Sequence, residues 1–431
     1  MFRSLYRGGL YLSILTALSL VRASDLEDPY PLPIDHPAIG YSDAPTHDAV
    51  SGLIDRIEKG KAKLDYHSRQ WSYLPSLLLR LGINVDSQIL VFSKTSFHPD
   101  LVSRTTPRAI YFNDTTSVAI VPNNDVLEIS SLDPKQGIIF YTLATRKTSQ
   151  PDFVRRGPEC LTCHCGAQTL DVPGRLISSL YAPGVRDARG LHGLSSVTDQ
   201  RVPLSERWGG WYVSGKLGFQ KHRGTRLGED PTAPPQDSRA QEENAIDHDI
   251  ITTVYPASTS DVVALMTFEH QSRMTNLLTR IGWETRIAIA DKTLDSFLPE
   301  LNSHIEELVS YMVFANEAPL AGPIEGASSF GKTFPERGPR DNQGRSLRDF
   351  DLKKRLFRYP ISYMIYSDAF DNIPATARDR IYQRLYDVLS GRDTSSKFSG
   401  LSIEDRRAAL EIVRLTKQNL PSYWKDQSAV R

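Results

Sequence analysis

Apolar residues recur with a period of two in the first third of the chain. Short runs rich in β-branched and aromatic residues alternate there with turn sequences such as Asn113-Asp114. Connections this short predict an antiparallel meander. The expected strands cover residues 88–94, 108–112, 117–121, 126–131 and 137–143. Residues 176–181 and 210–214 have the same pattern, and we expect them to complete the sheet.

A period near 3.6 precedes and follows this region. Leu53, Ile54 and Ile57 recur at helical spacing ahead of Gly60, and a second apolar run, residues 74–81, ends at Gly82. Four longer amphipathic runs predict helices at residues 261–281, 296–316, 375–389 and 403–417. The predicted fold class is therefore α+β, with an N-terminal antiparallel β-meander flanked by helices and a mainly helical C-terminal half.

The first 23 residues have the pattern of an export signal. Arg3 and Arg7 precede an apolar stretch, residues 9–21. In Val21-Arg22-Ala23, which follows, the first and third positions carry the small residues that signal peptidase recognises. The stretch is shorter than the roughly 20 residues needed to cross a bilayer. We therefore expect cleavage after Ala23 and a periplasmic or otherwise exported protein, with a retained anchor as the alternative. No later run is long and apolar enough for stable membrane insertion.

Composition sets the expected boundaries after the signal. Residues 24–47 are rich in proline, which cannot hold a helix, and predict an extended arm. Residues 228–247 are polar and proline-rich, which predicts a flexible loop. The expected order is a signal at 1–23, the arm at 24–47, an α+β sheet subdomain at 48–150, a cysteine-containing region at 151–227, the loop at 228–247 and a helical subdomain at 248–431 with a long loop at 317–345.

Charge and composition narrow the class of protein. The 431 residues include 51 basic and 51 acidic ones, with 40% hydrophobic and 24% charged, as in folded globular proteins. Removal of the signal takes away three arginines and leaves 408 residues, 48 of them basic and 51 acidic, a net charge of −3. This balance argues against a nucleic-acid-binding protein.

All three cysteines of the chain lie together, at positions 160, 163 and 165. Residues 160–164, Cys-Leu-Thr-Cys-His, have the pattern for covalent haem attachment, in which two thiols add to the porphyrin vinyl groups and the histidine binds the iron. We expect one haem c on Cys160 and Cys163, with His164 as proximal iron ligand. The alternatives are a tetrahedral zinc site from Cys160, Cys163, Cys165 and one histidine, and a thioredoxin-like dithiol, for which no βαβ pattern is present.

Several phrases of the sequence resemble a known family. They are residues 91–96 (Val-Phe-Ser-Lys-Thr-Ser), 106–114, 159–164, 207–213 and 268–271 (Phe-Glu-His-Gln). With them the chain, over nearly its whole exported length, resembles a family of exported bacterial monohaem c-type cytochrome proteins, which are mostly uncharacterised. The resemblance implies haem and export, and no particular substrate. Such proteins commonly have a polar residue after the haem histidine, whereas this chain has Cys165, either an added free thiol or a small buried side chain.

The sixth iron position has several candidates. Met266, His270 and Met274 recur at every fourth residue of one expected helix and therefore share a face. We expect His270 to be a distal ligand or a distal base, and the two methionines to be either ligands or core residues. The other histidines considered are His192, His222 and His248, all in expected loops.

Other side chains are candidates for haem contacts. The four arginines Arg337, Arg340, Arg345 and Arg348 suit the propionates, or they pair with the nearby acidic residues Glu336, Asp341 and Asp349. Arg155 and Arg156 precede the cysteines and are equally well placed. Trp208 and Trp211 could pack on a porphyrin or belong to the core.

Two functions fit these features. The first is an exported monohaem c-type cytochrome that transfers single electrons to or from a redox partner protein. The second is a haem-dependent oxidoreductase or peroxidase-like enzyme with an open or displaceable sixth iron position. A chain of 408 residues is several times larger than the helical shell that encloses one haem, so the additional residues are expected to bind a substrate, a peroxide or a redox partner. A zinc-binding protein is a further alternative.

Overall fold

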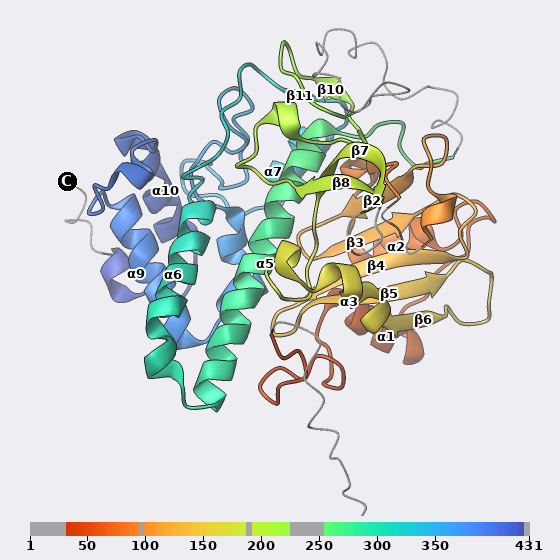
Figure 1. Ribbon diagram of the computed structural model, residues 1–431, viewed down its shortest axis with the longest axis horizontal. Helices are drawn as coiled ribbons and strands as arrows, with labels where there is room; N and C mark the ends of the chain where they lie inside the picture. The colour runs from red at the N-terminus through yellow and green to blue at the C-terminus, as the bar shows by residue number, and fades with distance from the viewer. Residues whose placement is uncertain (1–31, 95, 97, 187–191, 225–253, 426–431) are drawn as a thin grey trace, which may run out of the picture.

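The structure is a computed structural model, and it describes residues 32–94, 96, 98–186, 192–224 and 254–425. The expected signal at 1–23, the segment 228–247 that we expected to be a flexible loop, and His248 lie outside these residues. As predicted, the fold is α+β, with a seven-stranded antiparallel sheet beside a mainly helical C-terminal half (Figure 1). None of the helices described is long and apolar enough to cross a membrane.

The strands of the sheet have the order β6-β5-β4-β3-β2-β1-β9. Their bounds are β1 (Ile89–Val91), β2 (Arg108–Phe112), β3 (Thr116–Ile120), β4 (Val126–Asp133), β5 (Gly137–Ala144), β6 (Phe153–Arg156) and β9 (Trp211–Tyr212). The five expected meander strands are confirmed, with ends that differ by a few residues. β6, the short segment Phe-Val-Arg-Arg, was not predicted because two charged residues obscure its alternation.

Only one of the two later strands completes the sheet. Residues 211 and 212 pair with β1 as β9. β7 (Ser178–Arg186) instead pairs with β8 (His192–Val197) in a separate hairpin, so the expectation that residues 176–181 join the sheet was wrong. The physical reason is that β6 and β9 already occupy the two edges of the sheet. A third small sheet pairs β10 (Gly215–Lys216) with β11 (Glu325–Gly326).

The helices begin and end largely where the pattern predicts. Their bounds are α1 (Ala49–Glu58), α2 (Leu74–Leu81), α3 (Pro158–His164), α5 (Val262–Ala290), α6 (Leu294–Met312), α7 (Phe330–Glu336), α8 (Asp368–Asp371), α9 (Ala375–Leu389) and α10 (Ile403–Thr416). Asp48 caps α1 by accepting from two backbone N–H groups, and Gly82 ends α2 in the left-handed conformation that glycine favours. α5 continues nine residues beyond the expected end because Gly282 is accommodated inside it.

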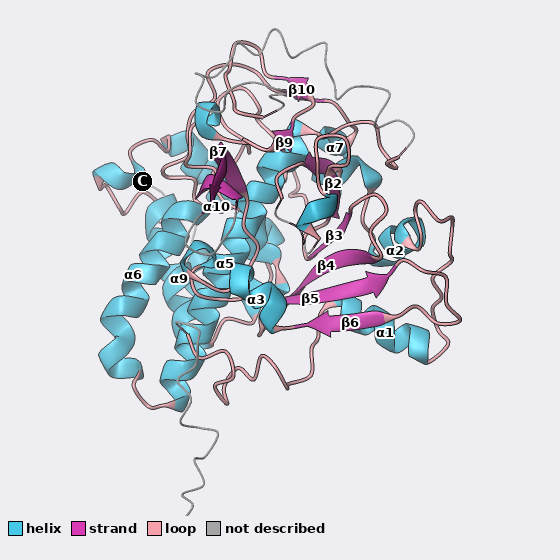
Figure 2. Ribbon diagram, turned by 45° about the vertical axis from the view of Figure 1, so that its right-hand side comes forward, coloured by secondary structure: helices cyan, strands magenta, loops and turns pink. Residues whose placement is uncertain are grey.

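The two faces of the sheet have different partners. On one face, Tyr141 of β5 donates a hydrogen bond to Asp48, the cap of α1. The opposite face, which we call the α5 face, carries the row Phe112, Ser117, Ser130, Phe140 and Arg156 across β2 to β6. α5 packs on this face through Phe268, whose ring lies 4.6 Å from that of Phe112. α3 lies near β5 and β6 beside α5 (Figure 2).

Two segments expected to be irregular are structured. Residues 32–47 form successive turns rather than an extended arm, because Ile39 and Tyr41 are buried and the Tyr41 hydroxyl donates to the carbonyl of Ile138. The expected loop at 317–345 contains β11 and α7. It is fixed by Ser328, which donates to Asp261, the N-cap of α5.

Candidate haem-binding site

α3 presents all three groups of the Cys-x-x-Cys-His motif. The helix begins with Pro158, whose missing N–H is no loss at a helix start. Cys163 follows Cys160 by three positions and His164 follows it by four. Residues at these spacings are neighbours on a helix surface, so all three share one side of α3. Both thiols are partly exposed and neither forms a disulfide. One short element thus directs two thiols and one imidazole toward the same region.

The imidazole of His164 is oriented by the backbone of Gly174. Its Nδ1–H donates to the Gly174 carbonyl at 2.9 Å, and the Gly174 N–H donates to the His164 carbonyl, also at 2.9 Å. The ring packs against Phe140 with centroids 4.9 Å apart. Burial lowers the pKa of His164 to about 4, so the imidazole is neutral at pH 7. This tautomer leaves the lone pair on Nε2, as metal-ligating histidines require.

The segment that orients His164 is itself fixed on both sides. The N–H of Ile138 in β5 donates to the carbonyl of Pro173 at 3.1 Å. The side-chain amide of Asn276 in α5 accepts from the Arg175 N–H at 3.2 Å and donates to its carbonyl at 2.8 Å. A Cβ on Gly174 would lie 2.3 Å from the Asn276 oxygen, so this position needs glycine. We call residues 173–175 the clamp.

The pKa of Cys160 bears on whether the two cysteines attach a haem or form a redox-active dithiol. Burial, and next the charges of Glu159 and Glu128, raise the pKa of Cys160 to about 12. Redox-active thiols of the thioredoxin type need a lowered pKa because the thiolate is the nucleophile. Cys160 is a neutral thiol here, which argues against a dithiol oxidoreductase. Glu128 is held by Arg108 at 3.0 Å and by Ser96 at 2.5 Å.

Cys165 lies apart from the other two thiols. It follows the last residue of α3, its backbone is extended, and its side chain is buried with Sγ 3.8 Å from the Asp171 carbonyl. This placement fits a small buried side chain. Within the described ranges, no three His, Cys, Asp or Glu side chains converge as a metal site requires, so the zinc alternative gains no support.

The structure does not bring His270 to this site. Its ring is fully buried, Nδ1–H donates to Gln200 Oε1 at 2.5 Å, and Nε2 accepts from the Ser362 hydroxyl at 2.7 Å. Burial lowers the pKa of His270 to about 3. The ring stacks on Tyr311 and Phe314. Because the lone pair of Nε2 is already used, our expectation of His270 as distal ligand or base is corrected to a hydrogen-bonded core histidine.

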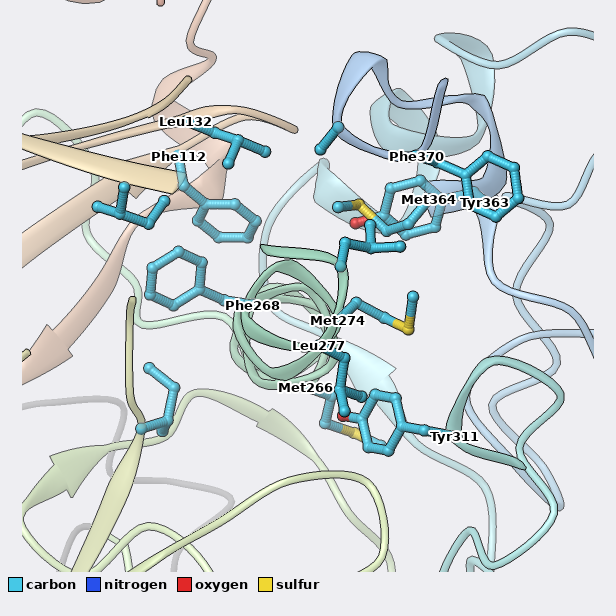
Figure 3. Close-up of a cluster of buried hydrophobic side chains, with 14 of the residues drawn as sticks. Phe112, Leu132, Met266, Phe268, Met274, Leu277, Tyr311, Tyr363, Met364 and Phe370 are labelled. Atoms are coloured by element: carbon cyan, nitrogen blue, oxygen red, sulfur yellow. The ribbon is translucent and has the colours of Figure 1, made fainter. Parts of the chain in front are cut away.

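The two methionines of α5 are also core residues. Met266 is 4% exposed and Met274 is fully buried. Figure 3 shows both on the side of α5 away from Phe112 and Phe268, with Met266 near Tyr311. They fill the interface between α5 and the C-terminal half, which is the role methionine often has in cores.

Of the remaining histidine candidates, only the side chain of His222 belongs to the part of the chain that is described. His222 lies in a loop as expected, but it is buried rather than solvated, accepts from the N–H of Gly224 and packs on Trp208. The side chain of His192 and the whole of His248 are outside the part of the structure that is described.

The expected propionate ligands have other partners. Arg340 pairs with Asp349 and Arg345 with Asp341, as the alternative hypothesis predicts. Arg348 forms a bidentate pair with Asp114, and Arg337 lies over the ring of Phe334. Arg155 donates to the Tyr41 carbonyl, whereas Arg156, which donates to Thr142 on the α5 face, remains near the cysteines. Trp208 and Trp211 are core residues.

Sequence reasoning missed Phe140, Asn276 and the clamp. Pro173-Gly174, which ends ten residues beyond His164, is the one local signal that could have indicated a tight backbone approach. Asn276 and Phe140 come from distant elements, and no local pattern connects them with His164.

Comparison with known proteins adds no further constraint. No family model, no curated protein and no solved structure matches this chain. The residues present nevertheless fit a haem: two partly exposed thiols and an imidazole with an unprotonated Nε2 share one side of α3.

Proposed function

We propose that this chain is an exported c-type cytochrome with one haem, held through Cys160 and Cys163 and ligated by His164, and that it transfers single electrons. The observation that carries the proposal is the hydrogen bond from His164 Nδ1–H to the Gly174 carbonyl. It gives the histidine of the attachment motif the tautomer and fixed orientation of a proximal ligand.

Each protein group has a defined part in this function. Cys160 and Cys163 would hold the haem through thioethers, each formed by addition of one Sγ–H across a vinyl group with the hydrogen going to the other vinyl carbon. His164 supplies the proximal nitrogen, and Phe140 and the clamp restrict its rotation. When bound, haem would supply the iron that gains and loses the electron.

A haem-dependent oxidoreductase is the second candidate, on one specific observation. Met266, His270 and Met274 are all engaged in the core between α5 and the C-terminal half. If haem is bound, none of these three side chains would supply a sixth ligand, and that position would be open to solvent or to a small molecule, as an enzyme requires. Rapid carbon monoxide binding by the reduced protein would favour this candidate, and slow binding would favour electron transfer alone.

The decisive experiment is haem attachment. Protein exported together with the cytochrome c maturation machinery should give covalent haem staining on a denaturing gel, and the double variant Cys160→Ala/Cys163→Ala should give none. Cys165→Ala is the matched control and should stain like the wild type, because its sulfur points to the Asp171 carbonyl. Staining that survives the double change, or protein that contains zinc and no haem, would refute the proposal.

Export is tested on the same preparation. We expect a mature N-terminus at Ser24 and recovery from the soluble periplasmic fraction. Intact residues 1–23 by mass, with the protein confined to membranes, would show that the apolar stretch is an anchor.

A further inference from the structure

Arg175 places a positive charge beside the proximal histidine. It directly follows Gly174, whose carbonyl accepts from His164. Its Nε donates to the Ser130 hydroxyl at 2.8 Å, and its Nη2 donates to the carbonyls of Ser130 at 2.9 Å and Thr115 at 2.6 Å. Ser130 is the cross-strand neighbour of Phe140, against which the His164 ring packs. The guanidinium is therefore tied to the α5 face next to the candidate haem site.

This charge is buried without a counter-charge. Arg175 is only 4% exposed, and in the described ranges no carboxylate pairs with it. Its Nη1 is buried and has no hydrogen-bond partner among those residues. The other deeply buried arginines differ, because Arg207 pairs with Glu269 at 3.2 Å and Arg348 pairs with Asp114. Burial lowers the pKa of Arg175 only to about 9, so it stays protonated at pH 7.

Keeping an unpaired cation in the interior is costly. The three hydrogen bonds to Ser130 and Thr115 use Nε and Nη2, leave Nη1 without a partner in the part of the chain that is described, and do not neutralise the charge. A neutral side chain such as glutamine could make bonds of this kind without the cost of burying a charge. The charge itself therefore calls for an explanation.

We propose that Arg175 is a positioning residue whose fixed positive charge raises the reduction potential of the haem iron. The inference rests on the proposed function. Reduction adds one electron and so removes one positive charge from the iron centre. A nearby buried cation disfavours the more positive oxidised form and favours the reduced one. At an effective dielectric constant of about 20, a unit charge roughly 10 Å away changes the equilibrium constant of reduction by about tenfold or more.

The test compares variants that separate charge from packing. Arg175→Gln keeps hydrogen-bond donors and loses the charge, Arg175→Met loses both, and Arg175→Lys keeps the charge. We expect the equilibrium constant for reduction to fall about tenfold in the Gln and Met variants, which is about 59 mV for one electron. The Lys variant should stay within about threefold of the wild type. Arg80→Gln, an exposed change on α2, is the control and should leave the potential unchanged.

Haem content is measured in the same samples, by the spectrum of the denatured pyridine complex. Neutral variants with full haem and the wild-type potential would overturn the inference, and so would a Lys variant that falls as far as Gln. Wild-type protein without covalent haem would overturn the proposed function, and this inference with it. Because Arg175→Gln and Arg175→Met differ in polarity, the potential can still be measured in one of them if the other fails to fold.

Discussion

His164 and His270 are both neutral imidazoles whose Nδ1–H is donated to an oxygen acceptor. They differ in the partner of the second nitrogen. Nε2 of His270 accepts from Ser362, whereas the lone pair of His164 Nε2 remains for a metal. The availability of this one lone pair, rather than burial or pKa, is what separates the proposed ligand His164 from the core histidine His270.

A substitution at His270 should therefore affect stability and leave the haem unchanged. His270→Leu deprives the Gln200 amide oxygen and the Ser362 hydroxyl of their partners, and we expect a loss of about 1–3 kcal/mol in the free energy of unfolding. The oxidised spectrum and the rate of carbon monoxide binding should match the wild type. Met274→Leu is the control, with a loss below about 1.5 kcal/mol. A change from low to high spin in His270→Leu would show that His270 does ligate the iron.

At this scale the sequence makes His164 the candidate iron ligand, which stays a prediction, and it did not indicate the core role of His270. The attachment motif is local, so five adjacent residues define it. α5 is buried on nearly all sides, and its polar residues Glu269, Gln271 and Asn276 each have a different partner from a distant segment. The position of His270 along the helix therefore could not show that its partners would be Gln200 and Ser362, which are distant in the sequence.

At the scale of elements, the clamp joins three parts of the fold. β5 holds it through Pro173, α5 holds it through Asn276, and it holds α3 through His164. The strands and helices themselves were largely predictable, because alternation and helical periodicity are local properties of the chain. The clamp has no secondary structure of its own, and its bonds reach residues up to 101 positions away. Neither periodicity nor composition could indicate them.

Gly174→Ala tests whether the clamp sets the geometry of the haem ligand. The new Cβ would lie 2.3 Å from the Asn276 oxygen, so either the Asn276 side chain or the backbone of residue 174 must shift. Either shift disturbs the clamp, and we expect it to weaken the bond from His164 Nδ1–H. We expect the haem to remain attached while its reduction potential shifts, because ligand basicity depends on that bond. Gly166→Ala is the control within the same region, since its Cβ would meet nothing within 4 Å. An unchanged potential in Gly174→Ala would show that the clamp has no influence on the iron.

On the scale of the whole molecule, α5 belongs to the core of both halves. Phe268 packs on the sheet, while His270 and Met274 face the C-terminal half. The segment after α6 joins the halves again, because the Ala318 N–H donates to the carbonyl of Gln200. Next to Ala318, Glu317 accepts from the N–H of Leu356 within the C-terminal half. The boundary we expected at residue 248 marks a change in secondary structure within one connected core.

Glu317 at this junction should make stability depend on pH. Burial raises the pKa of Glu317 from its ordinary value near 4.5 to about 7, although Leu356 and two arginines oppose the shift. The folded state then binds the proton more tightly than the unfolded state, so the free energy of unfolding falls as pH rises from about 4.5 to about 7. The fall attributable to Glu317 is about 3 kcal/mol. Above pH 7 both states are ionised, and the loss is complete.

Glu317→Gln keeps an oxygen to accept from Leu356 and removes the titrating proton. Urea unfolding between pH 5 and pH 8 should therefore show a flatter profile for this variant, which should exceed the wild type in stability at pH 8. Glu325→Gln is the control, because its pair with Lys216 is largely exposed and contributes little. Its profile should be parallel to that of the wild type. Parallel profiles for Glu317→Gln as well would mean that Glu317 ionises in the folded protein as it does in water, and that the junction between the two halves admits solvent.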